Sequence, residues 1–387
     1  NKKLLPTLKS NLEQGQLVIL LRQGLALIQE EKFIDAKNIF ELILKKNPNQ
    51  FDALQFLGGL LLKLNDSPKS VEFLSKALQV NPNHAASNSN LGIAYLNLNR
   101  LDEALLSFDK AIFIRPDYAE AYMNRGLVLE NLGRFDEALN NFAKAKSIKK
   151  DYEAAYSNCG NVLKKMNLYT EACLNYQAAI RIKPNNSEVY SNLGNCLKEI
   201  GEFDEAILNY RKAININPHN ADANFNLSLL NLLLGNFKDG WQGYEWGWKA
   251  GERSYRSSIL TKPFWLGVEK INDKRILLYG EMGIGDVIQF CRYAIEIRKL
   301  GAEVILEVPR KLFALFQGFT GFDYLVEQGK PIPPYDYQCC LMSLPLAFKT
   351  ELNTIPKYTK YLHVRTNLTY VIEQELKEKN KGKFPLV

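Results

Sequence analysis

A glycine-rich turn that ends in one acidic side chain is the segment of this sequence best suited to chemistry. The run GEMGIGD places Gly280, Gly283 and Gly285 between an apolar run and the start of an expected helix, and Asp286 closes it. Backbone amides and a helix N-terminus at such a turn favour an anion. Arg292, one to two turns further on, is the only nearby cation that could approach a phosphate, and it could equally be a solvated surface residue.

Two other interpretations of this turn stay open. Asp286 followed three residues later by Gln289 has the spacing of a helix-capping box, which explains an acid here without any catalysis. Glu307 ends the second expected strand about where a ribose-binding acid would lie, which leaves a dinucleotide site as an alternative. The turn is not a Walker A loop, because no Lys-Ser/Thr pair follows it, and its glycine order is not GxGxxG.

A second set of polar side chains recurs in register along the first two thirds of the chain. Carboxamides offer both a donor and an acceptor, the same pair that a peptide backbone offers, so a column of them can hold an extended chain of any sequence. The alternative is that they only bridge neighbouring helices. The members are Asn90, Asn124, Asn158, Asn192 and Asn226, with Asn161 and Asn195 one turn further on the same face.

A period of 34 residues positions this column. Small residues recur where two helices must approach closely, aromatic or Leu side chains fill the space beside them, and Asn or Gly ends each first helix. The small positions are Gly24, Gly58, Gly92, Gly126, Gly160, Gly194 and Ser228. The facing positions are Phe40, Leu74, Phe108, Phe142, Tyr176, Tyr210 and Tyr244, and the turns carry Asn65, Asn99, Gly133, Asn167, Gly201 and Gly235. Helix-ending prolines follow at Pro48, Pro82, Pro116, Pro184 and Pro218, with Lys150 in place of the sixth.

These positions resemble the tetratricopeptide repeat, which implies an α-solenoid whose first helices line a concave groove for a protein or peptide. We expect a capping helix over 1–16 and seven repeats over 17–254, with units at 17–50, 51–84, 85–118, 119–152, 153–186, 187–220 and 221–254. Because Lys150 replaces proline, we expect a longer or less sharply broken helix there, dividing the array.

Composition excludes several classes of function. Residues 1–254 carry 30 basic and 28 acidic side chains, so the array has no charge excess to attract nucleic acid. No apolar run is long enough to span a membrane, and no metal-binding motif occurs. The six cysteines are scattered without CxxC pairs, which favours a reducing cytoplasm. Four tryptophans cluster in GWQGYEWGW and PFW, where sealing a domain seam is favoured over stacking on a sugar.

After the repeats, the pattern changes to alternating strands and helices. A linker over 255–270 leads to RILLYGE, a helix from Val287 to Leu300, AEVILEVP, a helix from Lys311 and DYLVEQ. This order predicts parallel βαβ units. We therefore expect a small Rossmann-like α/β domain over 271–365, followed by a charged helix and tail over 366–387.

The later motifs, in their order, resemble bacterial tetratricopeptide proteins that carry a GT-B-type glycosyltransferase domain. They are GWQGYEW, PFW, GEMGIGDVIQFCRY and IPPYDYQCCLMSLPLAF. Heptosyltransferases and O-linked N-acetylglucosamine transferase are related to these proteins. The resemblance implies that Asp286, preceded by Gly285, is the base that deprotonates an acceptor hydroxyl and that a sugar nucleotide is the donor. The asparagine column likewise resembles the peptide-binding ladder of O-linked N-acetylglucosamine transferase. From the turn itself we expect Gly283, Gly285 and Arg292 to contact the acceptor or a phosphate.

Three residues depart from that family. Met282 replaces the usual Gln, Gly247 the usual Arg, and Gln338 a frequent His. Few residues follow Leu362, so we expect this chain to lack the donor-binding half and to be inactive by itself. The alternative is a non-catalytic adaptor for protein partners. We expect units five to seven, nearest the glycine-rich turn, to hold the ligand.

Overall fold

The computed structural model describes residues 4–251, 262–281, 283–358 and 361–362. Contacts divide the chain into two compact units, residues 1–201 and residues 202–387, and each is described by itself. The expected tail over 366–387 and Met282 lie outside the described residues, and the expected linker is described only from Lys262.

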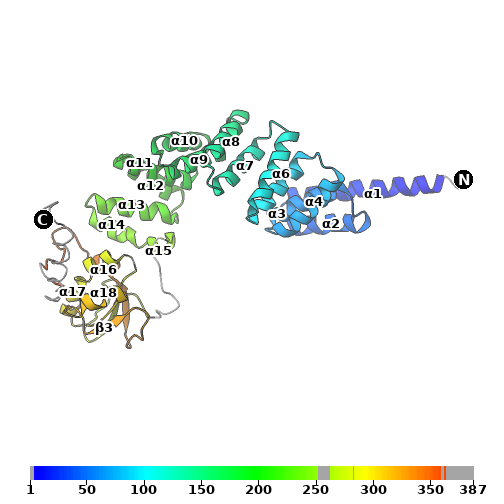
Figure 1. Ribbon diagram of the computed structural model, residues 1–387. Coiled ribbons are helices and arrows are strands. Elements are labelled where there is room, and N and C mark those ends of the chain that lie inside the picture. Colours follow the sequence, from blue (N-terminus) through cyan, green and yellow to red (C-terminus); the bar gives the residue numbers. More distant parts are fainter. Residues whose placement is uncertain (1–3, 252–261, 282, 359–360, 363–387) are drawn as a thin grey trace, which may run out of the picture. The chain divides into compact units, whose positions relative to one another are not determined.

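The first unit consists of helices in antiparallel pairs (Figure 1). Its helices are α1 (Leu4–Gln29), α2 (Phe33–Lys46), α3 (Phe51–Lys63), α4 (Ser67–Val80), α5 (Ala85–Asn97), α6 (Leu101–Ile114), α7 (Ala119–Asn131), α8 (Phe135–Ile148), α9 (Glu153–Lys165), α10 (Tyr169–Ile182) and α11 (Ser187–Glu199). The helix α1 runs without a break across residue 16, where the sequence predicts a boundary between cap and first repeat. Successive first helices contact one another, as α3 does α5 and α5 does α7, and contacts between successive second helices are sparser. The first helices therefore form the inner face of this unit.

Glycine makes room for a large side chain inside each helix pair. A methyl group built on Gly126 would lie 2.5 Å from Phe142, and one on Gly160 would lie 2.7 Å from Tyr176. Both rings are fully buried. At such distances any side chain larger than hydrogen would push the two helices apart, which explains why this position recurs as glycine.

The turn inside each pair uses the left-handed conformation that the sequence predicts. Asn65, Asn99 and Asn167 have φ between 56° and 61°, and Gly133 has φ of 72°. In the first repeat Glu31 occupies the same place with φ of 58°. A left-handed residue is a common way to end a helix, and Asn and Gly accept it at least cost.

The prediction of a longer helix at Lys150 is wrong. The helix α8 ends at Ile148 and its C-cap Lys149 is extended at φ −125° and ψ 97°, close to the −133° and 91° of Arg115 one repeat earlier. The Lys149 N–H still closes the helix on Ala145 O at 2.9 Å. The extended C-cap ends the helix without proline, and the boundary between the two units falls after residue 201 instead.

The second unit combines the last helices of the array with a parallel sheet. Its helices are α12 (Phe203–Ile216), α13 (Ala221–Leu233), α14 (Phe237–Tyr244), α15 (Gly247–Ala250), α16 (Ile284–Phe290), α17 (Tyr293–Lys299), α18 (Arg310–Phe316) and α19 (Leu344–Ala347). The strands β1 (Arg275–Tyr279), β2 (Glu303–Val308), β3 (Tyr324–Glu327) and β4 (Tyr337–Cys340) pair in the order β3-β2-β1-β4, all parallel. The sequence predicted three of these strands and missed β4.

Alternation along the strands gives the sheet two buried faces. Ile276, Leu278 and Val304 pack with Val287 and Ile297 of the helices α16 and α17. The opposite side chains pack with aromatic residues: Leu277, Tyr279, Ile305 and Cys340 lie against Trp248 and Phe264. Burial on both faces is typical of parallel sheets and explains their near-continuous apolar runs.

Two sequence expectations for this region need correction. The helix expected from Val287 to Leu300 is two helices, because a turn at Cys291 and Arg292 separates α16 from α17. Glu307 does not end β2, which continues to Val308. It pairs in register with Tyr279 and is 4 % exposed.

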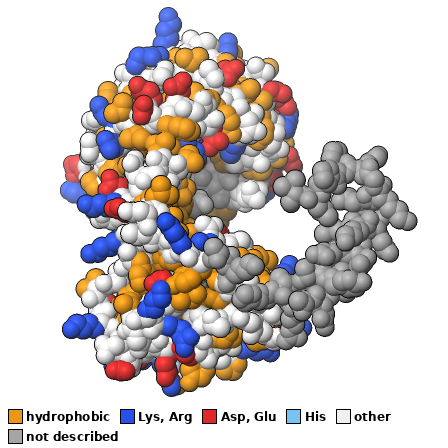
Figure 2. Space-filling model, turned by 90° about the vertical axis from the view of Figure 1, so that its left-hand side faces the viewer, with side chains coloured by type: hydrophobic (Ala, Val, Ile, Leu, Met, Phe, Trp, Pro, Cys, Tyr) orange, Lys and Arg blue, Asp and Glu red, His pale blue; other side chains and the backbone are white. Residues whose placement is uncertain are grey.

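Charges on the surface are mixed. Figure 2 shows basic, acidic and apolar side chains interspersed on the face that it draws. Among the described helices, none is both long and apolar enough to cross a membrane.

Candidate functional site

The glycine-rich turn lies at the carboxyl end of β1, and Asp286 is in the first turn of α16. The Asp286 carboxylate accepts a hydrogen bond from the backbone N–H of Gly283 at 3.0 Å. Gly283 is therefore the N-cap, and the expected capping box from Asp286 to Gln289 is wrong by three residues. The acid does satisfy a free amide of the helix start, as a side chain at this place commonly does.

The three glycines of the turn differ in what the fold requires of them. A methyl group on Gly280 would clash with Val287, so this glycine lets the end of β1 pack on α16. A methyl group on Gly283 would lie 3.5 Å from the Asp286 carboxylate, which is an ordinary contact distance. Among the described residues, which do not include Met282, a methyl group on Gly285 would meet nothing within 4 Å. The fold therefore explains Gly280 and leaves Gly285 beside open space next to Asp286.

Arg292 is used to hold the segment that follows α19. Its guanidinium donates to Gln289 O at 2.7 Å, to Pro356 O at 3.5 Å and to the Tyr361 hydroxyl at 3.1 Å. The Tyr361 hydroxyl in turn donates to Ile288 O at 3.0 Å. These contacts cross the turn between α16 and α17 and occupy donors that the sequence interpretation assigns to a phosphate.

Glu245 is a residue that the sequence reasoning missed. It follows α14, and its carboxylate accepts from the Ser343 hydroxyl at 2.7 Å and from Trp248 Nε1 at 3.0 Å. Ser343 lies three residues beyond the end of β4. The last repeat is thus joined by a charge-assisted bond to the edge of the sheet where β1 and β4 end. The acid within the aromatic run GWQGYEW is the sequence signal that could have indicated it.

The asparagine column divides into members with and without partners. Asn90 and Asn124 are half-buried on the inner face, and within the described part of the chain their amides make no hydrogen bond to protein. Asn158 Nδ2 reaches only Met123 Sδ, at 3.7 Å. Among the described residues, Asn90 and Asn124 therefore keep their full hydrogen-bonding capacity, and Asn158 uses only its Nδ2, in a weak bond to sulfur.

The members on α9 and α11 bond to each other. Asn161 Oδ1 accepts from the Tyr176 hydroxyl at 2.7 Å and from Asn192 Nδ2 at 3.4 Å, and Lys164 donates to Asn192 Oδ1 at 2.7 Å. Burial raises the pKa of Tyr176 well above its ordinary value, so its hydroxyl remains a donor. Asn195 also has a partner. This half of the column bridges neighbouring helices, which is the alternative that the sequence left open.

Asn226 belongs to the second unit and bonds within its own helix. Its Nδ2 donates to Asp222 O at 2.9 Å, four residues earlier. The structure therefore brings Asn161 and Asn192 together, leaves Asn90, Asn124 and Asn158 open, and does not extend one uniform ladder into residues 202–387.

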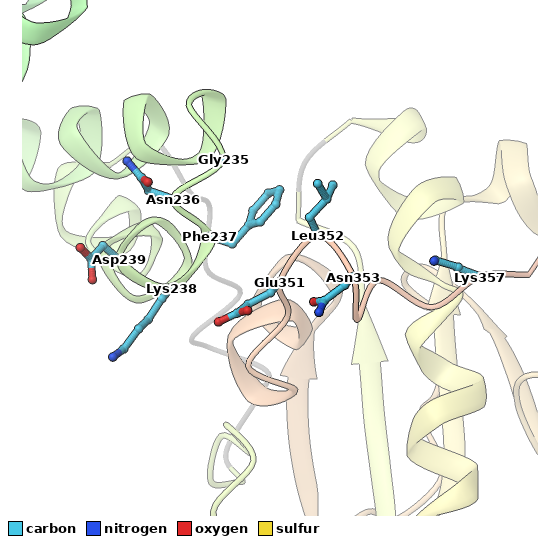
Figure 3. Close-up of a pocket in the computed structure, with 9 residues that line it drawn as sticks. All are labelled: Gly235, Asn236, Phe237, Lys238, Asp239, Glu351, Leu352, Asn353 and Lys357. Carbon is cyan, nitrogen blue, oxygen red and sulfur yellow. The ribbon is translucent and has the colours of Figure 1, made fainter.

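A set of hollows beside α14 has no counterpart among the sequence motifs. The largest, of about 860 Å³, lies between the α13–α14 turn and residues 351–357 (Figure 3). Two others, of about 320 and 440 Å³, share Phe237 with it. Their residues come from segments more than 100 positions apart in the sequence, so no local pattern could reveal them.

Metal ligands do not gather within the described ranges. No group of three or more His, Cys, Asp or Glu side chains there is placed to hold a metal ion. The six cysteines are buried and unbridged. Burial raises the pKa of Cys291 to about 12, so its thiol is protonated at neutral pH.

The structure places this chain in a general class of protein, an α-helical repeat array followed by a four-stranded parallel sheet. Tetratricopeptide repeat family models match residues 51–84, 73–105, 94–133, 119–152, 165–201 and 187–220. Residues 51–152 and 165–220 therefore match the tetratricopeptide repeat. No curated protein sequence matches the chain.

Solved structures resemble the helical array. PilW, described as a widely conserved type IV pilus biogenesis factor, is 18% identical over 55% of this chain and 98% of its own, with a TM-score of 0.51. YrrB, described as a tetratricopeptide protein with an unusual peptide-binding site, is 22% identical over 48% of this chain and 95% of its own, at 0.40. A thermophilic tetratricopeptide protein from Thermus thermophilus is 26% identical over 47% and 98%, at 0.41. The likeness to PilW supports the solenoid fold and nothing beyond it.

Proposed function

We propose that this chain is a scaffold that binds an extended segment of a partner protein on the inner face of its first helices. The observation that carries the proposal is the row of open carboxamides at Asn90, Asn124 and Asn158. An extended backbone presents alternating N–H and C=O groups, which such carboxamides can pair one by one. The proposal moves the binding region to units three to five, because Asn161 and Asn192 already bond to each other.

Peptides selected from a random library on the full-length chain test this proposal. We expect the triple variant Asn90→Ala, Asn124→Ala and Asn158→Ala to weaken their binding at least about tenfold, since each amide hydrogen bond contributes about 1 kcal/mol. The matched control, Asn161→Ala with Asn192→Ala, removes the internally bonded pair and should change affinity far less. Equal affinity of the triple variant and the wild type would contradict the proposal.

A second proposal concerns the sheet and follows from the resemblance to GT-B glycosyltransferases. Asp286 stands at the carboxyl end of β1 with Gly285 and open space beside it. The order β3-β2-β1-β4 supports a Rossmann-like half, since doubly wound nucleotide-binding sheets begin 3-2-1-4. In this proposal the domain is the acceptor-side half of a sugar-transfer site, and Asp286 accepts the proton of the attacking hydroxyl.

Sugar-nucleotide turnover distinguishes the two proposals. Uridine, guanosine and adenosine diphosphate sugars are incubated with the full-length chain and a selected peptide, and release of the nucleoside diphosphate is measured. Transfer that is abolished by Asp286→Asn but retained by Asp286→Glu would support the second proposal. Because this chain is expected to lack the donor-binding half, the same assay is run on a longer form of the protein that carries that half, and absence of release there with all donors would overturn the second proposal. Peptide binding does not depend on Asp286 in either form.

A further inference from the structure

Three adjoining hollows form one groove along the helix α14, which we call the α14 groove. Phe237 lines all three, Trp241 and Thr350 line two, and Lys238 and Glu351 line two. Figure 3 shows the α13–α14 turn and residues 351–353 facing each other across the largest hollow. The groove therefore has one wall from the last repeat and one from the segment after α19.

The wall from the segment after α19 is held in place without a ligand. The Thr350 N–H donates to Pro345 O at 2.8 Å, and its hydroxyl lies 2.9 Å from the Tyr293 hydroxyl. Further along, Arg292 donates to Pro356 O, and the hydroxyl of Tyr358 donates to Glu296. Because these bonds anchor the second wall to α17, the groove is formed before anything binds, which lowers the entropic cost of binding.

The two smaller hollows expose mainly apolar lining, whereas the largest is lined mostly by polar side chains. Phe237 and Trp241 form the α14 side, and Leu266, Pro345 and Leu346 form the opposite side of the second hollow. Leu352, which lines the largest hollow, is 72 % exposed. A large apolar side chain held open to water beside a preformed hollow indicates an interaction site.

The rim is basic. Lys238, Lys349 and Lys357 are exposed, and none forms an ion pair among the residues that the structure describes. Asp239 and Glu351 are the acids of the lining, so lysines outnumber them. Unpaired lysines around partly apolar hollows favour a partner that brings carboxylates and an apolar anchor.

We propose that the α14 groove binds an acidic, extended segment of a partner protein that seats one large apolar side chain beside Phe237. The row of three joined hollows suits successive side chains of an extended chain better than one compact small molecule. The residues that line this groove do not include Asn90, Asn124 or Asn158.

The test uses a library of twelve-residue peptides selected on the full-length chain in the presence of the peptide that binds the asparagine face. We expect enrichment of sequences with several Asp or Glu residues around one Leu, Phe, Trp or Met. Lys238→Glu with Lys349→Glu should weaken these peptides at least tenfold and reduce the salt dependence of binding. Phe237→Ser should weaken them comparably with little change in salt dependence.

Two controls keep the outcome interpretable. Lys270→Glu with Lys330→Glu makes the same charge change at exposed positions outside the groove, and should leave affinity within twofold. Lys238→Gln with Lys349→Gln should give an intermediate loss, and equal melting temperatures exclude unfolding as the cause. Selected peptides without an acidic excess, no selected peptides at all, or equal binding by the groove and control variants would each overturn the proposal.

Discussion

In the first unit the same contact between a glycine and a large side chain recurs in each repeat, whereas in the second unit the contacts that join α14 to the sheet occur once. Gly126 with Phe142 has equivalents one repeat before and after it. Trp241 with Phe290, at 5.9 Å between ring centroids, has none. Where the same local contact recurs, the stability of the array is approximately the sum of the stabilities of its repeats and of the interfaces between neighbouring repeats. Where a single long-range contact joins two parts, the stability of each part depends on the other.

The largest effect is expected from removing the single contact. Trp241→Ala should lower the free energy of unfolding of the second unit by about 3 kcal/mol, in the range of large-to-small aromatic changes. Because Trp241 packs against the sheet core, Phe290 and Tyr244, amides of α13, α14 and α16 should lose hydrogen-exchange protection together. The amides of α3 to α9 should keep theirs.

The matched control is Trp241→Phe. The indole N–H of Trp241 is buried and has no hydrogen-bond partner among the described residues. Phenylalanine keeps most of the ring contact and removes this unpaired donor, so the loss should be about 1 kcal/mol or less. If Trp241→Ala lowers exchange protection in the sheet alone and leaves α13 unchanged, the last repeat and the sheet do not depend on each other.

A smaller and more local effect is expected from the repeated contact. Gly126→Ala places a methyl group 2.5 Å from Phe142, and the overpacking should cost about 1–3 kcal/mol, partly offset by the better helix propensity of alanine. Protection should fall in α7 and α8 and remain in α3 and α4. Gly285→Ala, which adds the same methyl group to α16 where nothing lies within 4 Å, should be neutral or stabilising.

The same difference explains which features could be predicted from the sequence. Positions such as Gly126, Asn99 and Phe142 repeat, so each copy supports the assignment of the others, and the structure confirms their roles. The absence of proline at Lys150 led to the wrong prediction of a longer helix. The helix α8 ends at its extended C-cap, Lys149, without a proline. The period identified the asparagine positions, but it could not show that Asn161 and Asn192 bond to each other.

Single-copy features had no such support. The strand β4 is only Tyr337–Cys340 and carries no alternation long enough to detect. The break between α16 and α17 falls inside a continuous apolar pattern, so periodicity alone predicted one helix. Glu245 and Ser343 are 98 positions apart, and the walls of the α14 groove are similarly distant. Contacts of this kind depend on tertiary packing, which local patterns do not encode.

The smallest expected effect is the loss of one helix cap at low pH, at the start of α5. First helices are capped by the side chains of Gln50, His84, Asn186 and Asn220, and of these only histidine titrates near neutral pH. His84 Nδ1 accepts from the Ser87 N–H at 3.2 Å, which requires that nitrogen to be unprotonated. Burial lowers the pKa of His84 below its ordinary 6.5.

A lowered pKa means that the folded state binds the proton less well than the unfolded state. The cap contribution is therefore present above about pH 6.5 and is lost as pH falls through the folded pKa. Denaturant unfolding between pH 7.5 and 5.5 should show a loss of at most about 1 kcal/mol, the usual value of an N-cap, centred on α5. His84→Asn keeps a capping oxygen that does not titrate, so this variant should retain its stability across the same range; an unchanged pH dependence in the variant would assign the loss to other groups.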